Sequence, residues 1–342
     1  MFKIFDVQKI ARVTSLTFLL FSIAATSFAQ KANEAEDEKK ADASAIYSGL
    51  KFRSIGPALM SGRIADIVIH PNNENVWYVA VGSGGVWKTE NAGTTWSSLF
   101  DEQVSYSIGC ITLDPQNPEI VWVGTGENVG GRHVGYGDGI YKSEDGGKSW
   151  KNMGLKESDH LSKIIIHPTN SDIIWVASQG PLWSSGGERG VYKSTDGGET
   201  WNRTLGDSEW VGATDLLIDP RNPDLLYAAT WQRHRTVAGY LGGGPGTAIY
   251  KSTDGGETWN KLTNGLPGSN MGKIGLAISP MKPDVIYAAI ELDRRKGGVY
   301  RSDNQGATWT KMSDAVAGGT GPHYYQELYV SPHNFDELYL AN

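Results

Sequence analysis

Short hydrophobic runs alternate with turn residues along most of the chain after residue 60. In the stretch 161–205, β-branched and aromatic residues predict strands at 161–166, 173–177 and 190–193, and Trp201 begins a fourth. The segment 167–170 supplies a turn with Pro and Asn between the first two strands. The pattern therefore predicts one four-stranded antiparallel sheet in this stretch.

This unit is repeated. An octapeptide of the form [ST]-x-[DN]-x-G-x-[TS]-W occurs five times, as TENAGTTW, SEDGGKSW, STDGGETW twice and SDNQGATW. A second motif, such as IVIHPNNENVWYVA at 67–80, precedes each octapeptide and occurs a sixth time as LYVSPHNFDELYLA. The repeats predict an all-β fold, a β-propeller of four-stranded antiparallel blades over residues 46–342, with about five complete blades and part of a sixth.

The octapeptide has a structural explanation. Its fifth residue, Gly, allows a positive φ, its third residue accepts hydrogen bonds from the turn, and its Trp fills the space between sheets. Two of the five third residues are Asn, which keeps the acceptor without the charge, so the position is structural and neither catalytic nor calcium-binding. The third residues are Asn91, Asp145, Asp196, Asp254 and Asn304, and the tryptophans are Trp96, Trp150, Trp201, Trp259 and Trp309.

Composition excludes several classes of protein. With 43 Gly and 20% charged residues the chain does not fit a helical bundle, and a net charge of −7 without a basic block argues against nucleic-acid binding. Its single cysteine, Cys110, excludes an intramolecular disulfide and a cysteine zinc site. Histidines at 133, 234 and 323 would need three blades to aim them at one metal. We therefore predict no metal and no cofactor.

The N-terminus has the pattern of an export signal. Basic residues precede an apolar stretch at 13–25, and small residues at 27 and 29 mark a cleavage site after Ala29. We predict a signal peptide at 1–29, a flexible polar leader at 30–45 (with a solvated helix as the alternative), and a secreted or periplasmic mature chain. The apolar stretch is too short to span a membrane.

The five octapeptides resemble Asp-boxes, or bacterial neuraminidase (BNR) repeats. Such boxes occur in sialidases, family 74 xyloglucanases, photosystem II assembly factors and the ten-bladed N-terminal domain of sortilin and Vps10 proteins. The resemblance covers about residues 50–342 and is greatest to the sortilin and xyloglucanase groups. It implies a propeller more firmly than it implies an activity.

The loops between the second and third strands (B–C loops) vary in length, whereas the Asp-box turns do not, so we expect the ligand face on the B–C side. As solvated loop residues, Arg132, His133, Arg233 and Arg235 are expected to affect binding without affecting stability. The loop between the fourth strand and the next blade (D–A loop) contributes Tyr106, Asp159, His160 and Trp210. The predicted ligand-binding residues are Glu127, Arg132, His133, Gln179, Trp183, Arg233, His234, Arg235, Glu291, His323 and Tyr324.

Two functions from different classes remain. The first is a binding module for a peptide or protein segment, as the sortilin resemblance implies. The second is a glycan-processing hydrolase, but the xyloglucanase resemblance implies a general base at a position held here by Gly82, and the string at 52–57 is a poor match to a sialidase motif. Glu127 is the weak catalytic candidate, and an inverting enzyme needs a second carboxylate about 6.5 to 9.5 Å away. We favour binding.

The sixth repeat stops after its second predicted strand, at 338–341. We therefore expect a two-stranded sixth blade or an open gap in the ring, and further blades or domains in a longer protein.

Overall fold

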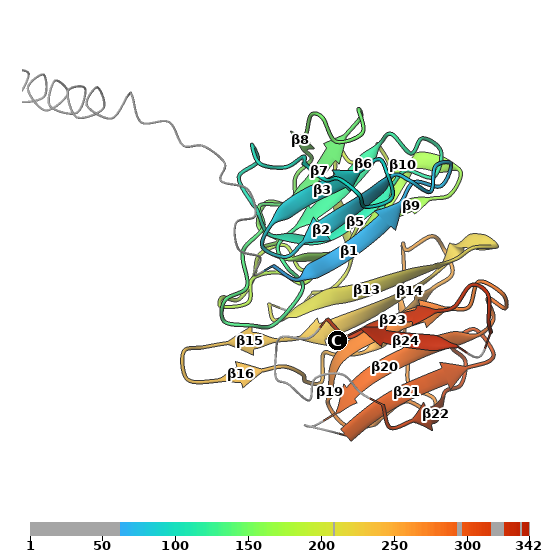
Figure 1. Cartoon of the computed structure of the whole chain (residues 1–342). Helices are drawn as coiled ribbons and strands as arrows, with labels where there is room; N and C mark the ends of the chain where they lie inside the picture. The colour runs from blue at the N-terminus through green and yellow to red at the C-terminus, as the bar shows by residue number, and fades with distance from the viewer. Residues whose placement is uncertain (1–61, 208, 293–295, 316–324, 336, 342) are drawn as a thin grey trace, which may run out of the picture. The chain divides into compact units, whose positions relative to one another are not determined.

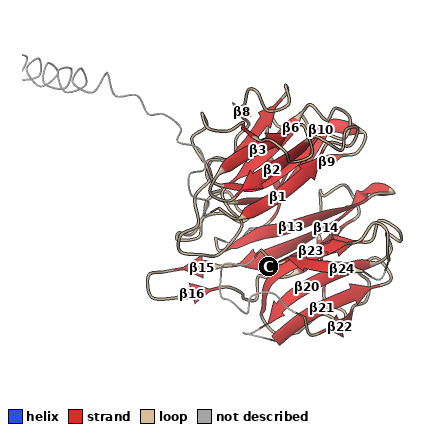
Figure 2. Cartoon of the chain, viewed as in Figure 1, coloured by secondary structure: helices blue, strands red, loops and turns tan. Residues whose placement is uncertain are grey.

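The regular elements that the structure describes are strands and turns, which confirms the all-β prediction (Figure 2). The computed structural model describes residues 62–342 except 208, 293–295, 316–324, 336 and 342, and they belong to one compact unit, Met60–Asn342. The other unit, Met1–Leu59, lies outside the described residues, and with it the predicted signal peptide and leader. Within the described part of the chain, no helix could span a membrane.

Five four-stranded antiparallel sheets and the two-stranded sheet of β23 and β24 follow one another along the described part of the chain, as predicted for five blades and part of a sixth (Figure 1). Blade 1 is β1 (Ile64–Ile69), β2 (Trp77–Val81), β3 (Gly85–Thr89) and β4 (Ser97–Ser98); blade 2 is β5 (Ile108–Leu113), β6 (Val121–Thr125), β7 (Ile140–Ser143) and β8 (Lys151–Asn152). Blade 3 is β9 (Leu161–His167), β10 (Asn170–Ser178), β11 (Gly190–Ser194) and β12 (Asn202–Leu205); blade 4 is β13 (Val211–Asp219), β14 (Asn222–Gln232), β17 (Ile249–Ser252) and β18 (Asn260–Leu262). Blade 5 is β19 (Met271–Ile278), β20 (Ile286–Leu292), β21 (Lys296–Ser302) and β22 (Thr310–Ser313); blade 6 is β23 (Glu327–Val330) and β24 (Leu338–Ala341).

Blade 3 shows how close the sequence prediction comes. Its second strand begins at Asn170, earlier than the predicted 173, because Asn170 pairs with His167 across a tight turn. Its fourth strand begins at Asn202, one residue after Trp201. The sequence did not predict the hairpin β15 (His234–Arg235) and β16 (Tyr240–Leu241), which is inserted between β14 and β17.

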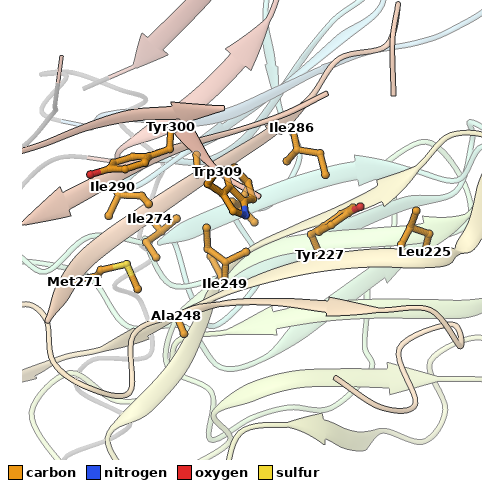
Figure 3. Packing of buried hydrophobic residues seen from close by; sticks show 13 residues of the cluster. Leu225, Tyr227, Ala248, Ile249, Met271, Ile274, Ile286, Ile290, Tyr300 and Trp309 are labelled. Carbon is orange, nitrogen blue, oxygen red and sulfur yellow. The ribbon is translucent and has the colours of Figure 1, made fainter. Parts of the chain in front are cut away.

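The first strands of successive blades contact each other from β1 to β23, and the core lies in layers between neighbouring blades. Figure 3 shows one layer, in which Tyr227 and Ile249 of blade 4 face Ile274, Ile290 and Trp309 of blade 5. Each layer joins strands that are about one repeat apart in the sequence. The repeat therefore determines both the blade and its contact with the next blade.

Each Asp-box turn is closed by its third residue. The Oδ1 of Asp196 accepts a hydrogen bond from the Thr200 N–H at 2.9 Å, and that of Asn304 accepts one from Thr308 at the same distance. The hydroxyl and backbone hydrogen bonds of Thr200 lower the Asp196 pKa to about 2. Because Asn makes the same backbone contact as Asp, the turn requires an acceptor at this position and not a charge.

Candidate functional site

The three long B–C loops, residues 126–139, 179–189 and 233–248, fold against one another. Val129, Leu182 and Tyr240, one from each loop, pack in one cluster with Ala65 and Tyr325. We call these loops and Tyr325 the loop cap. The loops of the predicted ligand face therefore lie together, but many of their polar side chains form hydrogen bonds with the neighbouring loops.

Glu127 holds three blades together at the cap. Its carboxylate accepts two hydrogen bonds of 2.6 Å from the Arg63 guanidinium of blade 1 and one of 2.6 Å from the Tyr325 hydroxyl, which precedes blade 6. Glu127 is 1% exposed. A Cβ at Gly82 would lie 2.5 Å from its Oε1, so this carboxylate fills the space next to the position where the xyloglucanase resemblance expects a general base.

Buried cations bind the backbone carbonyls of residues 128–130. Arg233 donates to the carbonyl of Val129 at 3.1 Å and Arg235 to that of Gly130 at 2.8 Å. Lys273, from β19 of blade 5, donates to the carbonyl of Asn128 at 2.7 Å. These bonds connect the loop of blade 2 to blades 4 and 5.

The expectation that Arg233 and Arg235 are solvated loop residues is wrong, because both side chains are buried. Gln179 is buried as well, and its Nε2 donates to the Asn128 carbonyl. The physical reason is that a packed loop leaves carbonyl oxygens without water, and each buried oxygen requires a donor. The long donor side chains of the neighbouring loops fill that need.

Other predicted residues lie outside this network. Arg132 and His133 are exposed, and Arg132 donates to the Val237 carbonyl at 3.1 Å. Trp183, His234 and Glu291 are partly exposed. His323 and Tyr324 lie outside the described residues.

An aromatic patch lies at the edge of the cap. Tyr106 and Tyr136 are 62% and 56% exposed, and their loops are joined by a 2.8 Å hydrogen bond from the Ser105 hydroxyl to the Tyr136 carbonyl. The ring of buried His160 lies 6.0 Å from that of Tyr136. Burial lowers the pKa of His160 well below its usual value, so its imidazole is neutral at pH 7. We call Tyr106, Tyr136 and Asp159 the rim patch.

Asp159 is unusual within this patch. Its backbone has a φ of 55°, a left-handed conformation that costs energy for a residue with a side chain. Burial raises the pKa of its carboxyl group, against the opposing effect of Arg233. Among the described residues, this carboxylate forms no hydrogen bond or ion pair.

A cavity of about 210 Å³ lies between the first strands and touches the cap at Asn128 and Tyr325. Asp66, Lys163, Asp215 and Glu327 line it and occupy the same repeat position in blades 1, 3, 4 and 6. Burial raises the pKa of Asp215 to about 6, although Lys163 lowers it. The cavity therefore combines acidic and basic groups.

The described residues contain no group of His, Cys, Asp and Glu arranged to hold a metal ion. Cys110 is buried in β5, and burial raises the pKa of its thiol.

Sequence reasoning missed five residues of the cap network. Four of them have partners far away in the sequence, and none of these four stands in a repeated motif that carries chemistry: Arg63, Asn128, Lys273 and Tyr325. The fifth, Arg189, donates to carbonyls of its own loop. Only the glycine-rich sequence of the loop 126–139 indicated a backbone that requires hydrogen-bond donors.

Comparison with known proteins supports the resemblance. Residues 138–266 match the family model described as sortilin, neurotensin receptor 3. Among curated proteins, the chain is 25% identical over 236 residues to a xyloglucanase of Hypocrea jecorina, and 24% identical over 233 residues to xyloglucanase Xgh74A of Acetivibrio thermocellus. These matches cover 60% and 57% of this chain but only 27% and 25% of the relatives, so the chain spans about a quarter of their length.

Solved structures agree on the fold. An ancestral GH74 enzyme superposes with a TM-score of 0.58 at 22% identity and covers 80% of this chain and 33% of its own. YCF48 bound to D1 peptide superposes with a TM-score of 0.52 at 16% identity, covering 84% of this chain and 78% of its own. The chain is therefore an Asp-box β-propeller that resembles Vps10-type propellers and GH74 xyloglucanases.

Proposed function

We propose that this propeller binds a neutral glycan chain on the rim patch. The observation that carries the proposal is the pair of exposed tyrosine rings, Tyr106 and Tyr136, on two loops held together by a hydrogen bond. Large apolar rings that are exposed on neighbouring loops mark a candidate interaction surface. A sugar ring presents an apolar C–H face to such a ring and hydroxyl groups at its edge.

Asp159 supplies the polar half of such a site. An ionised carboxylate is an acceptor only, and it can take hydrogen bonds from two sugar hydroxyls. Its left-handed backbone is held by neighbours, since its carbonyl accepts a 2.7 Å hydrogen bond from the Gly137 N–H. Strained residues of this kind cluster at ligand sites.

The curated relatives support a glycan as the ligand class, because they are named xyloglucanases. The state of Glu127 supports recognition by this face and not hydrolysis, since Arg63 and Tyr325 occupy its carboxylate. A glycan polymer also fits the export expected from the predicted signal peptide at 1–29. Hydrolysis, if the whole protein carries it, requires carboxylates other than Glu127.

Binding of xyloglucan oligosaccharides tests the proposal. Tyr136→Ala should weaken binding at least tenfold, about 1.4 kcal/mol, without lowering the melting temperature. Tyr339→Ala is the matched control, because Tyr339 is 56% exposed on β24, outside the rim patch, and should leave binding unchanged. Equal binding by the wild type and Tyr136→Ala would contradict the assignment.

A peptide that binds in the cavity between the first strands is the second candidate ligand. Its acidic and basic lining by Asp215 and Lys163 matches the mixed charges of a peptide segment. Three results together would favour the sortilin-like function. Fluorescently labelled peptides bind, Asp215→Asn weakens their binding, and xyloglucan does not compete with them.

A further inference from the structure

Two lysines line the cavity between the first strands, and they differ in exposure. Lys163, from β9, is partly exposed, whereas Lys273, from β19, is 2% exposed. Solvent therefore reaches the cavity on the side of Lys163, and Lys273 lies at its buried end. Three carboxylates lie close enough to Lys163 to favour its charge and raise its pKa: those of Asp66, Asp215 and Glu327.

The hydrogen bonds of the Lys273 nitrogen match those of a neutral amine. Its Nζ donates to the Asn128 backbone carbonyl at 2.7 Å and to the Asn128 Oδ1 at 3.3 Å. Among the described residues, it forms no third hydrogen bond and no ion pair. A protonated lysine has three N–H donors. A neutral amine has two, together with a lone pair, so these contacts leave the lone pair of Lys273 unused.

The surroundings of Lys273 favour this neutral form at pH 7. Arg233 lies near enough to disfavour a second cation, and burial lowers the Lys273 pKa to about 7. Burial outweighs three carboxylates that favour the charge, those of Asp215, Glu291 and Glu327. A desolvated lysine next to another cationic group is a form of amine nucleophile that attacks carbonyl groups.

An acceptor without a donor lies beside Lys273. Gln326 is 1% exposed, and its Nε2 donates to the Lys273 carbonyl at 3.0 Å and to the Ala289 carbonyl at 3.1 Å. Gln326 lines the same cavity, and within the described part of the chain its Oε1 has no hydrogen-bond partner. A buried acceptor without a donor costs free energy. A ligand that brings a hydroxyl group to this end of the cavity removes that cost.

We propose that the cavity binds a short hydroxyaldehyde covalently, as an imine on Lys273. The Nζ lone pair forms a bond with the carbonyl carbon, and the π electron pair of the C=O bond moves to the oxygen. Both protons of the amine leave with that oxygen as one water molecule, so a C=N bond replaces the C=O bond. The hydroxyl group of the ligand donates to the Gln326 Oε1.

The size and lining of the cavity suit such a ligand. Its volume of about 210 Å³ exceeds several times the roughly 30 Å³ that one water molecule occupies in the liquid, so a chain of a few carbon atoms fits. The charged groups on the side of Lys163 can bind further hydroxyl groups. The reaction does not depend on glycan binding at the rim patch or on a peptide ligand.

Reductive trapping tests the proposal. The folded full chain is incubated at pH 7 with limiting glycolaldehyde and with cyanoborohydride, which reduces an imine to a stable amine. Peptide mapping by mass spectrometry then gives the labelling rate of each lysine. Lys273 should be labelled at least about tenfold faster than Lys163, which lines the same cavity, and than exposed Lys151, because an ordinary lysine is almost fully protonated at this pH.

Propanal is the matched probe, because it is similar in size and lacks the hydroxyl group. Lys273 should prefer glycolaldehyde by about tenfold more than Lys151 does, since Lys151 reports only the intrinsic reactivity of the two aldehydes. Gln326→Met removes the acceptor with little change in side-chain volume and should abolish this preference. The preference is a ratio within one folded variant, so a lower melting temperature does not affect it.

Three results overturn the proposal. If Lys273 is labelled no faster than Lys163, its amine is protonated or out of reach. If both aldehydes label Lys273 equally fast, it is a reactive lysine without a ligand site. If Gln326→Met keeps the preference for glycolaldehyde, the Gln326 Oε1 does not bind the hydroxyl group.

Discussion

Two adjacent residues of each Asp-box turn have positive φ, and their surroundings differ. In the third box, Gly197 and Gly198 have φ values of 71° and 90°. The fourth position of the turn accepts a side chain, since Ala92 and Gln305 hold it with φ values of 52° and 56°. The fifth position is Gly in all five boxes, and the sequence identified this one alone as the position that needs positive φ.

Substitution by alanine should separate these two positions. Gly197→Ala should destabilise by about 1 kcal/mol, the cost of the left-handed backbone. Gly198→Ala should cost about 1 to 3 kcal/mol more, because its Cβ would lie 2.5 Å from the Trp122 ring of the preceding blade. Urea unfolding measures both, and equal costs would contradict the role of Trp122.

The Glu127 network is also a residue-scale feature, and its two ionic partners differ in exposure. The Glu127 side chain is 1% exposed, and that of Arg63 is 31% exposed. Removing the arginine therefore leaves a buried negative charge, whereas neutralising the glutamate leaves a cation that water can reach.

Arg63→Ala should therefore cost about 3 to 5 kcal/mol, the usual result of leaving one member of a buried ion pair. Glu127→Gln keeps the volume of the side chain and should cost clearly less, about 1 to 2 kcal/mol. Denaturant unfolding of both variants gives the comparison. A larger loss of stability for Glu127→Gln than for Arg63→Ala would contradict this prediction and would show that the negative charge of Glu127 itself stabilises the cap.

At the scale of elements, the cap shows how loops without regular structure become part of a core. Arg233 donates to the carbonyls of Val129 and Gly180, and Arg189 donates to those of Gln179 and Gly186. These bonds take the place of the backbone pairing that strands provide. A cap of this kind depends on the length and charge of a few side chains.

Arg233→Ala and Arg132→Ala, on two loops of the cap, should therefore behave differently. The first leaves the buried carbonyls of Val129 and Gly180 without a donor, at about 1 to 3 kcal/mol each. The second removes an exposed side chain and should stay within about 0.5 kcal/mol. Thermal melts of the two variants, together with amide exchange in the loop 126–139, provide the test, and matching melts would refute a structural role for Arg233.

The fold was more predictable from the sequence than the site for a physical reason. Blades come from local strands and turns repeated at a regular spacing, so Trp201 and the turn at 167–170 located their blade. The site comes from pairs such as Arg63 with Glu127 and Glu127 with Tyr325, separated by 64 and 198 residues. The repeat pattern of the sequence does not predict such pairs. A single arginine before a strand gives the same sequence pattern whether its side chain is buried or solvated.

At the scale of the whole molecule, Lys273 connects the parts of the propeller. It extends from β19 to the Asn128 carbonyl of the cap, and it lines the cavity between the first strands together with Asp215 and Glu327. Arg233 lies near enough to disfavour its charge, and Glu327 and Glu291 favour it. Burial outweighs the acidic neighbours and lowers the Lys273 pKa to about 7.

This shift predicts how stability depends on pH. Between pH 7 and about 10.4, the ordinary lysine pKa, the unfolded chain holds a proton that the folded chain has released, so this group makes stability rise with pH. Lys273→Met removes the cost of a buried ammonium, and its gain over the wild type should be largest near pH 6 and decline toward pH 10. Urea unfolding at pH 6, 8 and 10 gives that difference, in which the titration of other groups cancels. A difference that stays constant over this range would mean that Lys273 keeps its proton in the folded chain, paired with Glu327 across the cavity.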